Sequence, residues 1–342
     1  MSEPMIQTQG LTKHFTAAKK TVEAVRGLDL TVERGELVAL LGPNGAGKST
    51  TLRMLTTLIP PTSGSARVAG FDVTREPREV RARIGYIGQG NGAGHQQRGR
   101  DELVSQGRAY GLDRVSARRR ADELVGSLDL EAVADRKVST LSGGQRRRLD
   151  IAMGLIHGPG LLFLDEPSTG LDPQNRANLQ EHVVALRERS GTTVVLTTHY
   201  LDEADSLAER VVVIDHGTVV ADDTPDRLKA LHATDRMRLV LASPADASLA
   251  GQRVAAAHPD AHVVVDGHRV AVEMVGATAA VPGLLADLAG QGAPVRAAEV
   301  SRPTLDDVFL NLTGRSLREG GAAAGAPEQP EQVPSEKQEV FA

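Results

Sequence analysis

The chain has 342 residues, of which 40% are hydrophobic and 24% are charged, and this balance predicts a globular protein of about two domains. Its 39 basic and 44 acidic residues give a net charge of −5, so no general positive field favours nucleic acid as a partner. Cysteine is absent, which excludes disulfides and thiolate chemistry, and no apolar run reaches the roughly 18 to 20 residues that cross a bilayer.

Short apolar runs alternate with longer helical patterns up to about residue 230, which predicts a parallel sheet with helices on both faces, an α/β fold. The predicted strands are residues 36–41, 83–88, 161–165, 192–198 and 210–215. Ligands of such sheets bind beyond the carboxyl ends of the strands. The polar residues at these ends are therefore candidate site residues, namely Gln89, Asp165, Glu166 and His199.

A phosphate-binding loop follows the first predicted strand. The sequence GPNGAGKST at residues 42–50 matches the pattern G-x-x-x-x-G-K-[ST], and a helical run comes directly after it. The glycines let backbone N–H groups turn towards phosphate oxygens, Lys48 supplies a fixed charge, and the Ser49 hydroxyl can ligate Mg²⁺. We therefore predict nucleotide binding by Gly42, Pro43, Asn44, Gly45, Ala46, Gly47, Lys48, Ser49 and Thr50.

The strand-end residues complete a predicted catalytic set. Asp165 ends a buried-strand run and can hold Mg²⁺, while Glu166 can polarise a water for attack on a γ-phosphate. Without the phosphate loop, these acids would be ordinary loop residues after a core strand. His199 can donate to the γ-phosphate and Gln89 can sense Mg²⁺ or the attacking water, although either residue taken alone is an ordinary polar strand end.

Residues 91–158 are mostly helical and poor in strands, and we interpret them as an inserted helical lobe. Within this lobe the sequence LSGGQ, at 141–145, precedes an amphipathic run. That composition is typical of a helix N-terminus that holds an anion. The chain therefore has two predicted phosphate-binding helix starts, which raises the question of which phosphate the second one binds.

A third region, residues 233–315, has the order strand, helix, hairpin, helix, strand, helix, with the hairpin turning at Asp266–Gly267. This order predicts a small α+β domain of the ferredoxin-like type. The nucleotide-binding domain would then span 1–232. Residues 316–342 are rich in Gly, Pro, Gln and Glu, so we expect a disordered tail.

The last helix of the third region has the clearest start and stop signals in the sequence. Thr304 with Asp307 forms a capping-box-like start, and Gly314 provides a stop. An apolar face at helical spacing should be buried, and it consists of Leu305, Val308, Phe309 and Leu312.

Taken together, these motifs closely resemble those of the ATP-binding-cassette family. The ordered set is GPNGAGKST, Gln89, LSGGQ, LLFLDEP at 161–167, STGLD at 168–172, and His199. The resemblance covers residues 5–230 and implies a P-loop NTPase (RecA-like) core with a helical subdomain, ATP and Mg²⁺ as cofactors, and ATP hydrolysis. Mg²⁺ would be held by Ser49, Gln89 and Asp165.

The resemblance also answers the question about the second helix start. It implies that LSGGQ closes over the ATP of a second copy of the chain, head to tail, through Ser142, Gly143, Gly144 and Gln145. Asp172 would lie near that interface. Phe15 would stack on adenine, with a simple core role as the alternative.

Further segments are similar to the ATPase subunits of daunorubicin-resistance-type drug exporters, namely RDELVSQGRAYGL at 100–112, the run at 199–229 and PTLDDVFLNLTGR at 303–315. The similarity implies a subunit that powers drug or antibiotic export through a separate membrane-spanning permease. Such a subunit would lie peripherally on the cytoplasmic face of the cell membrane. The alternatives are a lipid or polysaccharide exporter, an importer, and a soluble cassette ATPase acting on ribosomes or DNA. The single cassette and the lack of a long coiled coil disfavour the last of these.

The loop after Gln89 departs from many cassettes. It reads GNGAGHQQRGR at 90–100, where others carry apolar or aromatic residues at the permease contact. One interpretation is an acid-seeking contact made by Arg98 and Arg100, and the other is a mobile solvated loop.

Overall fold

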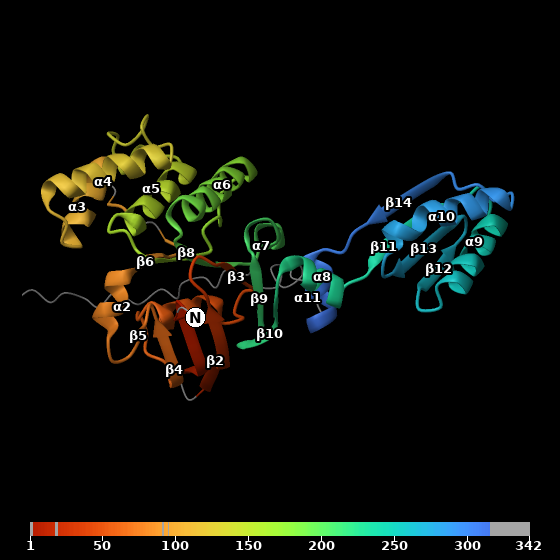
Figure 1. Ribbon diagram of the computed structural model, residues 1–342, viewed down its shortest axis with the longest axis horizontal. Helices are drawn as coiled ribbons and strands as arrows, with labels where there is room; N and C mark the ends of the chain where they lie inside the picture. Colours follow the sequence, from red (N-terminus) through yellow and green to blue (C-terminus); the bar gives the residue numbers. More distant parts are fainter. Residues whose placement is uncertain (1–2, 18–19, 91, 95, 315–342) are drawn as a thin grey trace, which may run out of the picture.

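The computed structural model describes residues 3–17, 20–90, 92–94 and 96–314, and the predicted disordered tail lies outside them. The described strands form a six-stranded sheet in the order β10-β9-β3-β8-β7-β6 and two four-stranded sheets, β2-β1-β4-β5 and β12-β13-β11-β14. In Figure 1 the first two sheets and their helices form one body, and the third sheet lies beside it.

The six-stranded sheet confirms the predicted α/β fold. Five neighbouring strands run parallel, and each begins and ends within one residue of its predicted run. These strands are β3 (Leu37–Leu41), β6 (Ile84–Ile87), β7 (Leu161–Asp165), β8 (Thr193–Thr198) and β9 (Arg210–Asp215). The sixth strand, β10 (Thr218–Asp223), was not predicted and pairs antiparallel with β9 at one edge.

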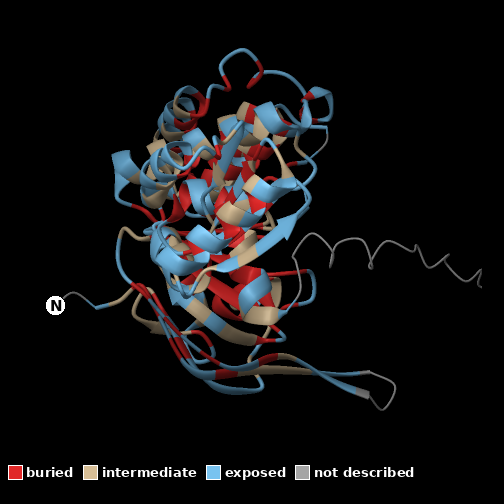
Figure 2. Ribbon diagram, turned by 90° about the vertical axis from the view of Figure 1, so that its right-hand side faces the viewer, coloured by how far each residue is buried: buried red, intermediate tan, exposed pale blue. Residues whose placement is uncertain are grey.

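The two faces of this sheet pack against different layers, because successive residues of a strand point to opposite sides. On one face, Ala39 and Leu164 join a core that contains helical residues such as Leu155 and Leu179. On the other face, Leu40 and Phe163 join a core with α1 and the N-terminal sheet. The helices of these two layers are α1 (Lys48–Leu55), α5 (Gly143–Leu155), α6 (Pro173–Ser190) and α7 (Leu201–Leu207). Figure 2 shows the buried residues concentrated between the layers.

The N-terminal sheet was not among the predicted strands. Its elements are β1 (Ile6–Ala17), β2 (Lys20–Val32), β4 (Ser63–Val68) and β5 (Phe71–Asp72), followed by α2 (Pro77–Arg83). Neighbouring strands pair antiparallel, and one face packs on the core while the other is exposed. The sheet places β2 beside the phosphate loop, since Val22 and Ala24 line the same cleft as Lys48.

The predicted helical lobe contains α3 (Gly99–Ala109), α4 (Arg114–Ser127) and a short 3₁₀ turn (Val138–Thr140), and it continues into α5. Asp113 caps α4 by accepting hydrogen bonds from the N–H groups of Val115 and Ser116, at 2.8 and 3.0 Å. The lobe shares its core with one face of the parallel sheet. It is therefore attached to the catalytic strands through α5.

The third sheet has the strand order and antiparallel pairing of a ferredoxin-like fold, as the sequence predicts. Two helices and the sheet enclose a core of their own, which includes Leu239, Val254 and Leu288. The elements are β11 (Asp235–Val240), α9 (Pro244–Ala257), β12 (His262–Asp266), β13 (Arg269–Met274), α10 (Ala277–Gly290) and β14 (Ala297–Ser301).

The last helix, α11 (Leu305–Thr313), has the predicted capping box and buried face, yet it packs away from the third sheet. Val308 and Phe309 lie in the core of the cassette, against α7 and α8 (Pro225–His232). Asn311 also donates to the carbonyl of His232, at 2.8 Å. The third sheet is thus inserted between two helices that belong to the cassette by packing.

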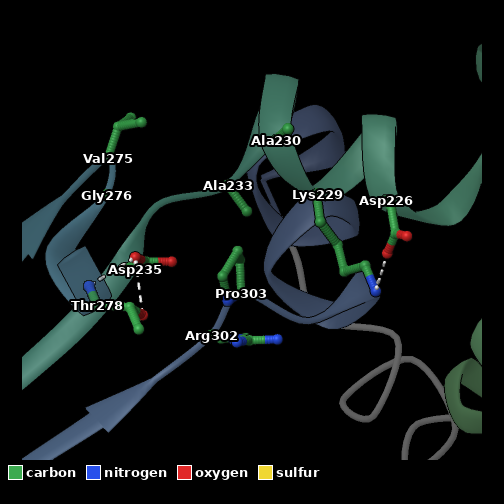
Figure 3. A pocket seen from close by; sticks show the side chains of 10 residues that line it. All are labelled: Asp226, Lys229, Ala230, Ala233, Asp235, Val275, Gly276, Thr278, Arg302 and Pro303. Carbon is green, nitrogen blue, oxygen red and sulfur yellow. Dashed lines mark hydrogen bonds and ion pairs between the residues drawn. The ribbon is translucent and has the colours of Figure 1, made fainter.

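A pocket of about 370 Å³ lies at this joint, between α8, the start of α10 and the β14–α11 connection. In Figure 3, Lys229 bonds to Asp226, and Asp235 accepts from Thr278 at the start of α10. Lys229 also pairs with Asp205, at 2.8 Å. Each of these pairs lies within one side of the joint, and none of the predicted catalytic residues lines the pocket.

Candidate nucleotide-binding site

The phosphate loop turns between β3 and α1, and its glycines are required by close backbone contacts. Gly47 has a φ of +105°, and a Cβ there would lie 2.4 Å from the carbonyl oxygen of Ala24. A Cβ on Gly42 would lie 2.1 Å from the carbonyl oxygen of Ile214. These two positions therefore exclude any side chain.

Lys48 begins α1 and is almost fully buried, with 4% of its surface exposed. Its ammonium donates to the carbonyls of Gly42 and Pro43 at 2.7 and 3.0 Å, and it lies 3.9 Å from Glu166. Burial lowers the pKa of Lys48, while Glu166 and Asp165 act in the opposite direction. The loop thus holds one cation at the floor of a cleft of about 550 Å³.

Ser49, Asp165 and Gln89 meet at the carboxyl edge of the sheet. The Ser49 hydroxyl donates to Asp165 Oδ1 at 2.7 Å, and Gln89 Nε2 donates to the same hydroxyl at 3.2 Å. Asp165 is fully buried, and its Oδ2 has no hydrogen-bond partner among the described residues. A buried carboxylate oxygen beside a serine hydroxyl fits Mg²⁺, which binds through one or two carboxylates and completes its shell with phosphates and water.

Glu166 follows Asp165 and has a backbone conformation that is unusual for a non-glycine residue, with a φ of +48°. Its N–H donates to Thr197, to Oγ1 at 2.9 Å and to the carbonyl at 3.2 Å, and these bonds support the strained backbone. The carboxylate lies 3.5 Å from His199 Nδ1. The contact with His199, followed by the charge of Lys48, lowers the pKa of Glu166, so the group is ionised near neutral pH and can act as a base.

The LSGGQ segment lies on the helical lobe, outside the phosphate cleft of the same chain. Ser142 caps α5: its hydroxyl accepts from the N–H of Gln145 at 3.3 Å, and Gln145 Oε1 accepts from the N–H of Ser142 at 3.0 Å. A Cβ on Gly144 would lie 2.3 Å from Asn175 Oδ1, near the start of α6. Asp172 caps α6 by accepting from the Asn175 N–H, at 2.9 Å. The two helix starts therefore pack together on a separate surface.

Phe15 is 43% exposed, so the core role that we considered for it is wrong. It pairs with Val22 across β1 and β2, and Val22 lines the phosphate cleft. An aromatic face at this edge of the cleft remains compatible with adenine stacking.

Sequence reasoning missed Arg147, a buried residue of α5 that contacts three backbone carbonyls. It donates to Gly88, Asp165 and Pro167 at 2.7, 3.2 and 2.9 Å. Burial lowers the pKa of Arg147. The helix that follows LSGGQ is thereby bonded to the strand ends that carry Gln89 and Glu166.

The basic loop after Gln89 does not present a free pair of arginines. Arg100 makes ion pairs with Asp122 and Asp135 within the helical lobe, so it is not available for an acidic partner. The acid-seeking interpretation of this loop is therefore wrong for Arg100.

The ABC transporter family model matches residues 25–169. The chain is 47% identical over 294 residues to the daunorubicin resistance ATP-binding protein DrrA2 of Streptomyces coeruleorubidus. The matched region covers 85% of this chain and 90% of that protein. It is 43% identical to the daunorubicin/doxorubicin resistance ATP-binding protein DrrA of Streptomyces peucetius, over 95% of this chain and 97% of that protein.

Among solved structures, the fold is similar to the ATP-binding cassette MJ0796 in a dimeric post-hydrolysis state bound to ADP and Pi. The TM-score is 0.60 at 26% identity, over 64% of this chain and 98% of that chain.

Proposed function

Because the chain belongs to the ABC transporter family of ATP-binding proteins, we propose that it is the ATP-hydrolysing subunit of a bacterial exporter of a drug or antibiotic. The predicted family, the P-loop fold and the ATPase activity are confirmed by the comparisons. One observation carries the export proposal: relatives named for daunorubicin resistance match the chain almost from end to end, including the region beyond the cassette.

We assign the steps of hydrolysis to the residues that converge on the cleft. Lys48 and the loop N–H groups bind the β- and γ-phosphates of ATP. Ser49, Gln89 and Asp165 would hold Mg²⁺, which would neutralise phosphate charge there. Glu166 accepts a proton from the attacking water, and His199 holds Glu166 ionised and donates towards the γ-phosphate.

A second copy of the chain is the proposed partner for LSGGQ. Ser142, Gly143, Gly144 and Gln145 lie on a different structural unit from Lys48, which supports a role in binding the γ-phosphate of another chain. The dimeric form of the similar cassette MJ0796 supports this arrangement. ATP would then bridge two copies, and hydrolysis would release them.

A membrane permease is the other proposed partner, and it would keep the subunit on the cytoplasmic face of the cell membrane. No helix in the described ranges is both long and apolar enough to span a bilayer. We retain the division into residues 1–232, 233–315 and 316–342 as a proposal, with α11 docked on the first part. A lipid or polysaccharide exporter remains the competing function.

Affinity purification tests the proposal. Tagged protein carrying Glu166→Gln would be isolated with ATP from detergent-solubilised membranes of its native bacterium, and its partners identified by mass spectrometry. A stoichiometric multi-helix membrane protein is expected. That pair, expressed in a drug-sensitive host, should lower daunorubicin accumulation with the wild-type chain but not with Glu166→Gln. Recovery of ribosomal or DNA-associated proteins instead would refute the transport function.

A further inference from the structure

Tyr200, the residue that follows His199, has a ring that contacts side chains from two parts of the cassette. Its ring centroid lies 4.2 Å from that of the His199 imidazole, and the two planes are tilted by 37°. The guanidinium carbon of Arg176, on α6, lies 3.9 Å from the same Tyr200 centroid. The three side chains therefore form one series of contacts, which ends at His199 beside Glu166.

The imidazole of His199 is only weakly held by its polar contacts. The side chain is 29% exposed and lies between β8 and α7. Its Nδ1 is 3.5 Å from Glu166 Oε2, and this nitrogen forms no hydrogen bond with any described residue. A partly exposed side chain with one such contact can change rotamer readily. The contact with the Tyr200 ring adds a second restraint on its orientation.

Tyr200 itself is held at its backbone and at its ring. Its N–H donates to Thr198 Oγ1 at 2.9 Å, and its carbonyl accepts from the N–H of Ala204 at 3.2 Å, at the start of α7. The cation of Arg176 is attracted to the π electrons of the ring. The ring is thereby tied to α6 as well as to α7.

Arg176 is placed by an acid as well as by the ring. Burial raises the pKa of Glu203, on α7, whereas its hydrogen bonds with Thr198 and Ser168 and the charge of Arg176 act in the opposite direction. Arg176 Nε is buried and has no hydrogen-bond partner in the described part of the chain. The face of the guanidinium over Tyr200 is thus a main contact of this cation.

We propose that Tyr200, held by Arg176, is a positioning residue for ATP hydrolysis. It fixes the His199 imidazole with Nδ1 towards Glu166, which leaves Nε2 for the γ-phosphate. A donor acts on a transition-state oxygen from about 3 Å, and a misplacement of about 1 Å can cost about a hundredfold in rate. This inference rests on the proposed function, because it concerns the residue that we assign to the γ-phosphate.

The test measures phosphate release by the full-length chain across an ATP titration. Tyr200→Ala should lower kcat at least about tenfold and leave KM for ATP within about twofold, because Lys48 and its loop are untouched. Tyr200→Phe keeps the ring and should retain kcat within about twofold. Tyr200→Leu keeps apolar volume without a flat ring and should behave as Tyr200→Ala does, so it replaces that variant if urea unfolding shows a folding defect.

Arg176→Met keeps an unbranched apolar stem and removes the cation. It should lower kcat by about threefold or more, and Arg176→Lys, which restores a cation, should lower it less.

A double-mutant cycle separates positioning from general packing. In a His199→Ala background, Tyr200→Ala should lower kcat by less than about twofold, because a residue that acts only through the imidazole has nothing left to position. The matched control is Tyr110→Ala. Tyr110 stacks on His157 in the helical lobe, with ring centroids 3.9 Å apart, and loss of that stack should leave kcat unchanged.

Several results would overturn the positioning role while leaving the proposed function intact. They are a kcat of Tyr200→Ala within about twofold of wild type when His199→Ala is impaired, an equal effect of Tyr200→Ala with and without His199, and a loss in Tyr200→Phe as large as in Tyr200→Ala. An unchanged kcat in Arg176→Met would remove Arg176 from the proposal. Full activity of His199→Ala would remove His199 from hydrolysis and this inference with it, and a wild-type chain without ATPase activity would refute the proposed function.

Discussion

The Ser49 hydroxyl lies 2.7 Å from Asp165 Oδ1, although the two residues are 116 positions apart in the sequence. This bond joins the start of α1 to the end of β7. The other carboxylate oxygen, Asp165 Oδ2, has no hydrogen-bond partner among the described residues and is therefore available to bind a cation. This arrangement makes the pair the expected centre of Mg²⁺ binding.

Asp165→Asn should raise the Mg²⁺ concentration needed for half-maximal ATPase activity at least about tenfold, because a charged ligand is replaced by a neutral one. Steady-state phosphate release across a Mg²⁺ titration measures the change. Thr197→Val removes a donor to Asp165 Oδ1 and one acceptor of the Glu166 N–H but keeps both carboxylate oxygens of Asp165, so it should shift the midpoint less. An unchanged midpoint in Asp165→Asn would place the metal elsewhere.

Glu166→Gln should slow ATP hydrolysis at least about a hundredfold, the usual contribution of a general base. ATP binding should persist, since Lys48 and the loop are untouched, and a dimer should accumulate when ATP is added. Light scattering coupled to size-exclusion chromatography measures the dimer. Unimpaired turnover would remove the general-base role from Glu166.

The parallel strands and the phosphate loop were predictable because each depends on a local pattern. A strand buried on both faces is a continuous apolar run, as in LLFLD, and the loop requires glycine where a Cβ would meet backbone. The acids and His199 followed from the rule that ligands lie at strand ends. The N-terminal sheet was missed because β2 mixes exposed polar residues with its buried ones and has no long apolar run.

Other features depend on tertiary contacts that the sequence does not reveal. Three consecutive arginines follow Gln145, and only the fold shows that Arg147 is the one buried against distant carbonyls. The apolar face of α11 was predicted, but its partner was not. Amphipathicity indicates that a face is buried and does not indicate which core receives it.

His199→Ala should move the acid limb of the ATPase pH profile to higher pH. The contact with His199 is the main cause that lowers the pKa of Glu166, so its loss raises that pKa. A base works above its pKa and loses activity as the pH falls through it, so the loss begins at a higher pH in the variant. Initial rates at fixed ionic strength measure the limb. A lower rate with an unmoved limb would limit His199 to phosphate contact.

Ser142→Arg should permit ATP binding but prevent formation of the productive dimer, because the bulky cation would occupy the surface that we propose receives the γ-phosphate of a second chain. Lys48→Ala should weaken phosphate binding directly. Mixing the two inactive variants should restore ATPase activity in part, since one mixed-dimer site combines an intact phosphate loop with an intact LSGGQ. No recovery on mixing, with mixed dimers demonstrated, would argue against action in trans.

Phe309→Ala should destabilise the cassette by about 3–5 kcal/mol, because the ring is 1% exposed in the core shared with α7 and α8. The neighbouring Leu310 is 38% exposed, so Leu310→Ala is a matched control with a much smaller expected effect. Urea unfolding gives the free energies.

Hydrogen exchange then locates the effect of Phe309→Ala: amides of α7 and α8 should lose protection while β11 and β13 keep theirs. Loss confined to β11 and β13 would mean that α11 stabilises the third sheet rather than the cassette.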